Sequence, residues 1–279
     1  IFKTMNENRS IIDIAQAAKK EQQTAPEAPQ TSRVQTDNSQ ADALKELLKK
    51  VDSKIAWVDI ELPSRGLLSG GANSEVQIRP FTFEDEKILR TVRNANQVAD
   101  IIKVLLNRAV KNLDYDKLTL ADKTFLIFKL REISYGNDYA IDLECPKCTA
   151  KNSLNVELSR LPVKYLDRDS LEATKVTLPD SEVEVEFRYP MADDDANMTD
   201  VGAIMDGLWK FVKSVGGHDS RMVIQQFISK TTGKDVLTLQ NKIFGTDYGL
   251  QTKVNFICNS CGADSALELP LNESFFSVS

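Results

Sequence analysis

Four cysteines constrain this chain more than any other feature of its sequence. They form two CxxC pairs, Cys145 with Cys148 and Cys258 with Cys261, on either side of the long stretch 149–257. A CxxC turn places two thiolates on one metal ion, and two such turns supply the four ligands that a structural zinc ion prefers. We therefore expect one structural zinc ion, bound by all four cysteines in a closed site.

The residues around the cysteines strengthen this interpretation. A compact zinc ribbon separates its pairs by roughly 15 to 20 residues, so the spacing alone is a poor match. However, apolar residues alternate on both sides of each pair, which predicts a β-hairpin with a cysteine turn at its tip. These residues are Tyr139, Ile141, Leu143, Leu154, Val156 and Leu158 for the first pair, and Val254, Phe256, Ile257, Leu267, Leu269 and Leu271 for the second.

Other states of the cysteines remain as alternatives. The start of the chain has no continuous apolar stretch and no small-residue cleavage site, so we expect folding in a reducing cytosol, where thiols stay reduced. Disulfides and free thiols are therefore the weaker interpretations. A redox CxxC is expected singly at the start of a helix, whereas both pairs here lie between predicted strands.

Strand and helix signals elsewhere predict an α+β fold. The Thr119-x-x-Asp122 cap opens one helix, which is expected to end at Gly136. Strands are expected at residues 57–62, 75–80, 176–178 and 183–189. Helices are expected at residues 43–51, 82–92, 98–110, 119–136, 193–212 and 222–228.

Together these elements predict a zinc-ribbon-like pair of β-hairpins with helical layers and a folded insertion between the two cysteine knuckles. The predicted domains are a flexible extension and linker at 1–43, strands and a helical layer at 44–137, and zinc-ribbon hairpins at 138–160 and 250–279 of a region 138–279 whose α/β insertion spans 161–249.

The N-terminal extension has two parts. Apolar residues at helical spacing occupy 11–18, and residues 19–43 are dominated by Gln, Thr, Ala, Ser and Pro. The second part buries too little apolar surface to offset its ordering entropy. We expect the first part to order only on a neighbouring subunit, the alternative being a tail without function.

The two cysteine regions echo each other in sequence. Thr119-Leu120, Lys123 and Phe125 precede Tyr135-Gly136, much as Thr238-Leu239, Lys242 and Phe244 precede Tyr248-Gly249. Each Tyr-Gly is followed by an extended segment and a cysteine pair. This pattern predicts paired halves.

Charge and hydropathy limit the classes of partner. The net charge is −6, and the sequence has no cluster of Lys and Arg. Nucleic-acid binding depends on neutralising phosphates, so we expect no nucleic-acid partner. No apolar run approaches the roughly 20 residues that span a bilayer, so we expect no membrane partner.

The remaining chemically suggestive residues indicate structure rather than catalysis. His218 is the only histidine, in a turn, and we expect it to be a solvated loop or cap residue. The acidic groups 84–86 and 193–195 stand where helices are expected to begin, so we interpret them as caps favoured by the helix dipole. Phe275-Phe276 is expected to pack in the core, the alternative being an exposed anchor for a neighbouring subunit. With no phosphate loop and no nucleophile motif, the chain is predicted not to be an enzyme.

Several segments, in order along the chain, resemble the baseplate protein family of T-even-type, contractile-tailed bacteriophages. They cover roughly residues 60–279. They are Pro63-Ser64-Arg65-Gly66, Arg79-Pro80-Phe81-Thr82 with Glu84-Asp85-Glu86-Lys87-Ile88-Leu89, 122–131, Ser134-Tyr135-Gly136-Asn137-Asp138-Tyr139, Cys145-Pro146-Lys147-Cys148, Leu158-Ser159, Leu178-Pro179, and the final Phe-x-Cys-x-x-Cys with Phe275-Phe276. The extension at 1–55 departs from the family pattern.

The resemblance implies a structural or assembly role in a phage tail without catalysis. Members of the family include the baseplate hub assembly protein, and hub, wedge and assembly-only roles all remain open. The implied partners are other baseplate and tail subunits, and the implied location is the virion tail, assembled in the host cytoplasm. The rival functions are a nucleic-acid-binding zinc-ribbon accessory factor and a metal-dependent hydrolase.

Overall fold

The computed structural model of the chain describes residues 38–91, 97–168, 174–197, 201–245, 248–271 and 273–276. By its contacts the chain divides into two units, residues 1–53 and residues 54–279. The described part of the first unit contains helix α2 (Asn38–Asp52), which begins ahead of the predicted start at Ala43. The apolar segment 11–18 lies outside the described residues.

An antiparallel three-stranded sheet opens the second unit. Its strands β1 (Val58–Ile60), β2 (Val76–Ile78) and β3 (Val110–Lys111) lie in that order. Helices α3 (Phe83–Leu89) and α4 (Val98–Ala109) connect β2 to β3. Val110 was expected to continue the helix, but this β-branched residue pairs with Ile78 in the sheet instead.

Helix α5 (Leu120–Tyr135) is the central element of this part of the fold. It begins at Thr119, whose side chain accepts a hydrogen bond from the Asp122 backbone N–H, and it ends at Gly136, as predicted. Its buried residues occupy several faces, because elements of the chain pack around it. These buried residues are Asp122, Lys123, Phe125, Leu126, Ile127, Phe128, Leu130 and Arg131.

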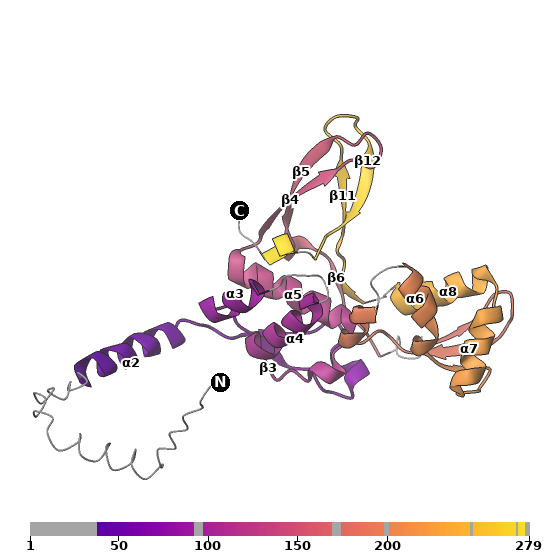
Figure 1. The fold of residues 1–279 in the computed structure, drawn as a ribbon, viewed down its shortest axis with the longest axis horizontal. Coiled ribbons are helices and arrows are strands. Elements are labelled where there is room, and N and C mark those ends of the chain that lie inside the picture. Colours follow the sequence, from indigo (N-terminus) through magenta and orange to yellow (C-terminus); the bar gives the residue numbers. More distant parts are fainter. Residues whose placement is uncertain are drawn as a thin grey trace, which may run out of the picture. The chain divides into compact units, whose positions relative to one another are not determined.

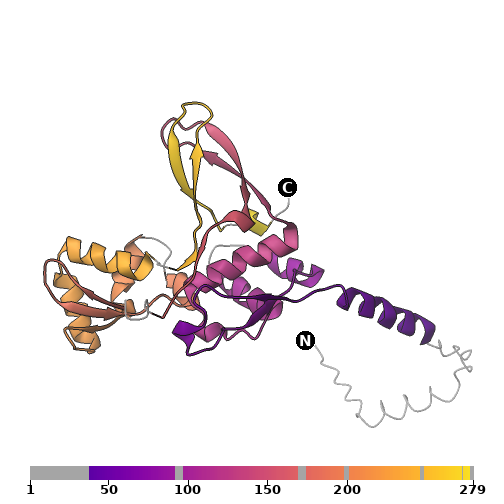
Figure 2. The ribbon, with the colours of Figure 1, turned by 180° about the vertical axis from the view of Figure 1, so that it is seen from behind.

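The two predicted hairpins are present. Strand β4 (Asp138–Glu144) pairs with β5 (Lys151–Glu157), and β11 (Lys253–Ile257) pairs with β12 (Asp264–Glu268), both antiparallel. Both views show the four strands lying side by side (Figures 1 and 2). The short strands β6 (Val163–Lys164) and β10 (Gly249–Leu250) form a separate pair.

A second three-stranded sheet lies between the hairpins in sequence. It consists of β7 (Lys175–Thr177), β8 (Glu184–Phe187) and β9 (Val212–Val215). The predicted helix at 193–212 is wrong at its C-terminal end, because Val212 pairs with Phe187 in the sheet. The helical elements around it are η6 (Ala192–Asn197), α6 (Val201–Gly207), η7 (Leu208–Phe211), α7 (Arg221–Lys230) and α8 (Gly233–Phe244).

These elements follow the same order twice. We name residues 58–158 the N-repeat and residues 174–271 the C-repeat. Each has three antiparallel strands, helices between the second and third strands, a helix capped by a Thr-x-x-Asp pair, and a CxxC hairpin. The strand registers match as well, because Ile60 pairs with Val76 as Val176 pairs with Val185.

An arginine–aspartate pair recurs after the middle strand of each repeat. Arg79 Nη1 lies 2.7 Å from Asp85, and Arg188 Nη1 lies 2.6 Å from Asp194. In both repeats the arginine backbone N–H donates to the residue before the third strand, at Ala109 O and Phe211 O. In each repeat, therefore, the same ion pair and backbone hydrogen bond join the helical connection to the sheet.

The capped helices show where the sequence echo was misaligned. Asp122 accepts a hydrogen bond from the Ser64 backbone N–H at 2.9 Å, and Asp235 accepts one from Asp180 at 2.8 Å. The counterpart of Thr119 is therefore Thr232, which caps α8, and not Thr238, which lies within it. The prediction of paired halves is confirmed, with this correction of register.

The two repeats contribute to two main hydrophobic clusters and share residues between them. The N-repeat cluster includes Phe128 of α5, and it also takes in Leu269 of the C-repeat and Phe275 from the end of the chain. The C-repeat cluster includes Phe187 and Tyr248, with Leu67 and Leu68 of the N-repeat packed against it. Because each repeat completes the core of the other, the second unit is held together across the repeats.

Candidate metal centre

The structure brings the four predicted cysteines together at the tips of the two hairpins. Their sulfur atoms all lie within 4.8 Å of one another. Cys145 Sγ lies 3.8 Å from Cys261 Sγ, and Cys148 Sγ lies 3.6 Å from Cys258 Sγ. Cys145 corresponds to Cys258 and Cys148 corresponds to Cys261. Each close pair of sulfurs therefore joins one cysteine from each repeat, and each repeat supplies half of the site.

Both cysteine turns have the same backbone. Cys145 N donates to Ala150 O at 2.9 Å, and Cys258 N donates to Ala263 O at 3.0 Å. The residue after each second cysteine adopts a left-handed conformation, with φ 59 at Thr149 and φ 67 at Gly262. Glycine takes this conformation without strain, whereas threonine does so at a cost. Both cysteine turns therefore share one backbone hydrogen bond and one left-handed residue.

The arrangement of the sulfurs fits a tetrahedral metal ion. Zinc binds thiolate at about 2.3 Å, which places the sulfurs of a regular tetrahedron about 3.8 Å apart. Two of the sulfur–sulfur distances, 3.6 and 3.8 Å, agree with that spacing, while the full set extends to no more than 4.8 Å. These two distances are far longer than the roughly 2.05 Å of a disulfide. The four thiols are unpaired. That they bind a metal remains a prediction.

The surroundings shift the pKa values of two of the thiols in opposite directions. Backbone N–H groups of Cys261 and Ser260 lower the pKa of Cys258 to about 6. At Cys148 the Ala150 N–H lowers the pKa, but the Cys261 thiol, desolvation and the Cys258 thiol together outweigh it and raise the pKa to about 12. The hydrogen bonds to Cys258 therefore favour the thiolate form of its side chain.

Asn152 is a supporting residue that sequence reasoning missed. It is buried, its Nδ2 lies 3.6 Å from Cys258 Sγ, and its Oδ1 accepts a hydrogen bond from Asn259 N at 2.9 Å. Asn152 belongs to the N-repeat hairpin, whereas both partners belong to the C-repeat hairpin. The signal available in the sequence was a polar residue on the strand face that also carries Leu154 and Val156.

The predicted capping carboxylates have structural partners. Asp85 forms a capping box with Thr82 and an ion pair with Arg108 at 2.7 Å. In the 193–195 group each aspartate pairs with a different cation rather than acting only as a cap. These pairs are Asp193 with Lys103 at 3.0 Å, Asp194 with Arg188 at 2.6 Å, and Asp195 with Lys123 at 2.5 Å.

The other singled-out residues lie away from the cysteines. His218 is exposed in the turn after β9, where its backbone pairs with Val215. Phe275 is fully buried against Phe128 and Tyr139, which confirms its predicted core role, and Phe276 packs on Phe81. No helix among the described residues is long and apolar enough to cross a membrane.

Comparison with known proteins gives the family. Neither curated proteins nor solved structures gave a match. The family model described as T4 bacteriophage base plate protein matches residues 58–277, which include both repeats and all four cysteines but not α2. Because this match covers most of the chain, the resemblance of the sequence segments is confirmed, and the chain belongs to the T4-type bacteriophage baseplate protein family.

Proposed function

We propose that the protein is a structural subunit of the tail baseplate in which one zinc ion joins the two repeats, and that it acts through protein interfaces without turnover. Membership of the family carries the baseplate role and the virion tail location. The observation that supports the zinc ion is the meeting of four thiols, two from each repeat, at the spacing of a tetrahedral site.

In this proposal the metal replaces a hydrophobic core at the hairpin tips. Among the described residues, the buried members of the hydrophobic cluster there are only Cys145, Phe256 and Cys258. Such a small apolar cluster buries too little surface to hold two hairpins together, and small modules of this kind depend on metal. A bound zinc ion would supply four coordinate bonds to thiolates and leave no position open for substrate.

The absence of turnover is supported by how the acidic residues are used. Asp85, Asp194 and Asp195 are each committed to arginine or lysine partners within the fold. General acid–base catalysis needs a carboxyl group that faces a substrate and has a shifted, available pKa. Asp85 and Asp194 instead join a helical connection to the arginine that follows the middle strand, and Asp195 joins η6 to α5.

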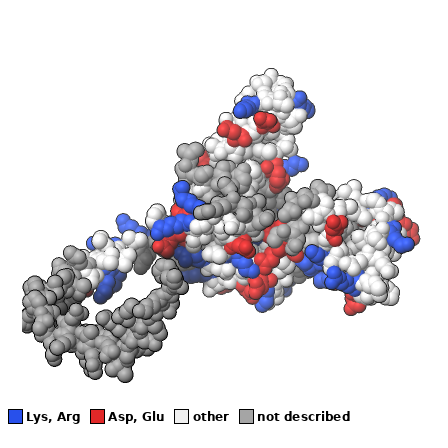
Figure 3. All heavy atoms as spheres, in the orientation of Figure 1, with Lys and Arg blue, Asp and Glu red and all other residues white. Residues whose placement is uncertain are grey.

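The partners proposed are other baseplate and tail subunits, with assembly in the host cytoplasm. On the face shown in Figure 3, basic and acidic side chains of the described residues are interspersed. This mixture suits protein contacts better than a polyanion. The N-terminal segment 11–18 is proposed to order on a neighbouring subunit. The family match does not distinguish hub, wedge and assembly-only roles.

The decisive experiment combines metal analysis with phage complementation. Purified protein should contain one zinc per chain, and elemental analysis that finds none, or two, would overturn the metal assignment. Phage lacking the protein should be rescued by the His218→Ala variant but not by Cys145→Ser. Particles that assemble with His218→Ala and yet fail to infect would point to an active site.

The nucleic-acid alternative needs its own measurement. Filter binding with duplex and single-stranded DNA over a salt series should give only weak retention without sequence preference. Specific retention that falls steeply with salt would favour an accessory factor over a structural subunit.

A further inference from the structure

The four cysteines at the hairpin tips differ in exposure in the same way in both repeats. Cys145 and Cys258 are buried, whereas Cys148 and Cys261 lie at the surface. Each surface thiol is close to a buried thiol of the other hairpin. Cys148 Sγ lies 3.6 Å from Cys258 Sγ, and Cys261 Sγ lies 3.8 Å from Cys145 Sγ. Thiols that react with oxidants are accessible and often lie beside a second, resolving thiol. The tips therefore contain two pairs of this kind.

Hydrogen bonds hold these pairs in place. Thr149 N donates to Cys145 O at 2.8 Å, and Gly262 N donates to Cys258 O at 2.9 Å, so both cysteine turns are closed in the same way. Asn152 of the first hairpin links the two turns, because its Nδ2 lies 3.6 Å from Cys258 Sγ. The sequence contains four cysteines in all, so no further thiol of the chain competes with these four.

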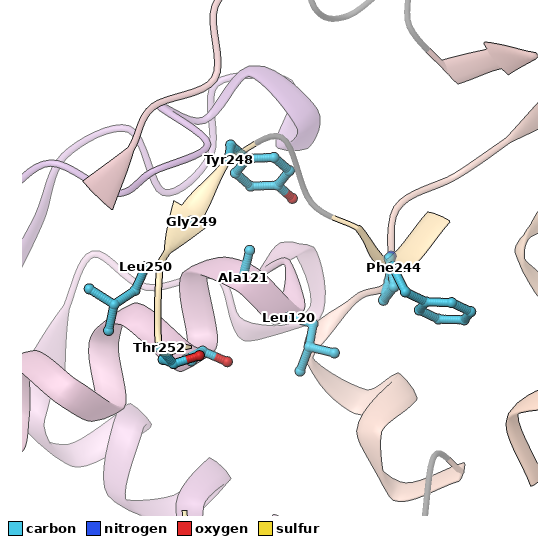
Figure 4. A pocket seen from close by; sticks show the side chains of 9 residues that line it. Leu120, Ala121, Phe244, Tyr248, Gly249, Leu250 and Thr252 are labelled. Carbon is cyan, nitrogen blue, oxygen red and sulfur yellow. The ribbon is translucent and has the colours of Figure 1, made fainter. Parts of the chain in front are cut away.

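The hollow of about 210 Å³ beside the start of α5 offers no comparable chemistry. Its lining includes Tyr248, Gly249 and Leu250, which follow one another along the segment that passes this helix (Figure 4). No cysteine, methionine or charged side chain lines it. An oxidant that entered the hollow would meet no sulfur atom. The thiols at the hairpin tips are therefore the place where the structure presents oxidisable groups in pairs.

We propose that a peroxide converts each cross-hairpin pair into a disulfide, Cys148 with Cys258 and Cys261 with Cys145. The surface thiolate first attacks a peroxide oxygen. The S–O bond forms, the O–O bond breaks, and hydroxide leaves and takes up the proton of the thiol to give water. The surface cysteine is then a sulfenic acid, oxidised by two electrons while the peroxide is reduced.

The buried thiol of the other hairpin completes the reaction. Its thiolate attacks the sulfenic acid sulfur, so that the S–S bond forms, the S–O bond breaks, and a second hydroxide leaves and is protonated to water. Each pair thus consumes two thiols and one hydrogen peroxide and yields one disulfide and two molecules of water. The buried position of the attacking cysteine shields it from the peroxide itself.

The two disulfides join the same hairpins that the metal joins in the proposed function. The hydrophobic cluster at the tips is small, so the hairpins need a link of some kind. Thiols stay reduced in a cytosol but are oxidised at the surface of a virion, so the covalent link forms after the particle leaves its host. This occasion rests on the proposed baseplate function, whereas the pairing of the thiols is a property of the isolated chain.

Disulfide mapping of the full chain tests the pairing. Protein as purified is freed of reductant, treated with hydrogen peroxide beside a chelator that traps released metal, alkylated and digested with trypsin without reduction. Trypsin places Cys145 on peptide 132–147, Cys148 on peptide 148–151, and the other two cysteines on peptide 254–279. We expect one species that contains all three peptides and that disappears after reduction with dithiothreitol. Peptides 132–147 and 148–151 joined only to each other would overturn the proposal.

The variant Ser260→Lys assigns the partners. Ser260 corresponds to Lys147 of the first turn, and lysine there lets trypsin cleave between Cys258 and Cys261. We expect the Cys258 peptide to be joined to 148–151 and the Cys261 peptide to 132–147. The reverse pairing, disulfides between chains, or sulfinic acid at Cys148 would each overturn the proposal. An unchanged melting temperature before oxidation confirms that the variant folds.

Two further measurements complete the experiment. Met222 is 66% exposed, so its sulfoxide reports the peroxide dose, and thiols that stay reduced at a dose that oxidises Met222 would overturn the proposal. In the presence of the chelator, oxidation should raise the melting temperature by about 5 °C or more, and an unchanged value would overturn the linking role. Zinc content is measured on untreated protein, so failure of the metal proposal is seen independently of the disulfides.

Discussion

The N-repeat and the C-repeat share a scaffold but differ in what surrounds it. Both keep the sheet, the arginine–aspartate pair, the Thr-x-x-Asp cap and the cysteine hairpin. The N-repeat adds a longer loop with η1 (Leu67–Ser69), whereas the C-repeat adds α7 between β9 and the capped helix. The shared parts are those that fold the unit and supply the thiols. The two repeats therefore differ in the segments that connect the shared elements, which lie at the surface or against the other repeat.

Loss of one cysteine should have the largest effect, and the two repeats should respond alike. Cys145→Ser and Cys258→Ser each remove a buried thiol of the proposed metal site at corresponding positions. Because metal binding contributes to folding, we expect each to lose zinc and to lower the free energy of unfolding by about 4 kcal/mol or more. Thermal unfolding with metal analysis measures this.

A matched control is Ser260→Ala, which alters the same turn without touching a ligand and should keep both metal and stability. If Cys145→Ser proved harmless while Cys258→Ser was severe, the site would not be shared equally between the repeats.

The second largest loss of stability should come from truncating the buried ring of Phe275. It should exceed the loss from an exposed substitution in the C-repeat. Phe275→Ala removes a fully buried ring from the N-repeat cluster, for which we expect a loss of about 3–5 kcal/mol in the free energy of unfolding. Leu237→Ala, on the exposed face of α8, should cost less than about 0.5 kcal/mol. Denaturant titration compares the two. Equal losses would mean that the aromatic ending is not part of the core.

The arginine–aspartate pairs should differ in strength between the repeats. Burial would raise the pKa of Asp85, but hydrogen bonds from Arg79, Thr82 and Arg108 outweigh it and hold the pKa well below its usual range. Burial also opposes ionisation of Asp194, where Arg188 lowers the pKa. Asp85 is the more buried, so we expect Asp85→Asn to cost about 3 kcal/mol and Asp194→Asn about 1 kcal/mol.

The same pairs predict a pH dependence. Because both folded-state pKa values are lowered, their contribution is fully present above the usual aspartate pKa of about 4 and is lost as pH falls below it. Wild-type stability should therefore fall in acid more steeply than that of Asp85→Asn. Urea unfolding from pH 6 to pH 3 tests this, and parallel curves for the two proteins would contradict it.

Local patterns predicted much of this fold, and long-range pairing decided the rest. The α+β class, both hairpins, the caps at Thr82 and Thr119 and the meeting of the cysteines follow from spacing and periodicity. Strand β9 does not, because Val212 continues the helical pattern of the preceding residues and becomes a strand only by pairing with Phe187. Asn152 was missed for the same reason, since its partners lie on the other hairpin.

The smallest predicted effect tests the alignment of the repeats themselves. Thr119 and Thr232 each accept a hydrogen bond from the third residue of their helix, whereas Thr238 lies in mid-helix and donates to Lys234 O. Removing a cap typically costs about 1 kcal/mol, so Thr119→Ala and Thr232→Ala should each lose that much.

Thr238→Ala should change stability by less than about 0.5 kcal/mol, because alanine favours helix and replaces a bond that competes with the backbone. Calorimetry of the three variants would decide the point. A loss at Thr238 equal to that at Thr119 would restore the alignment read from the sequence echo.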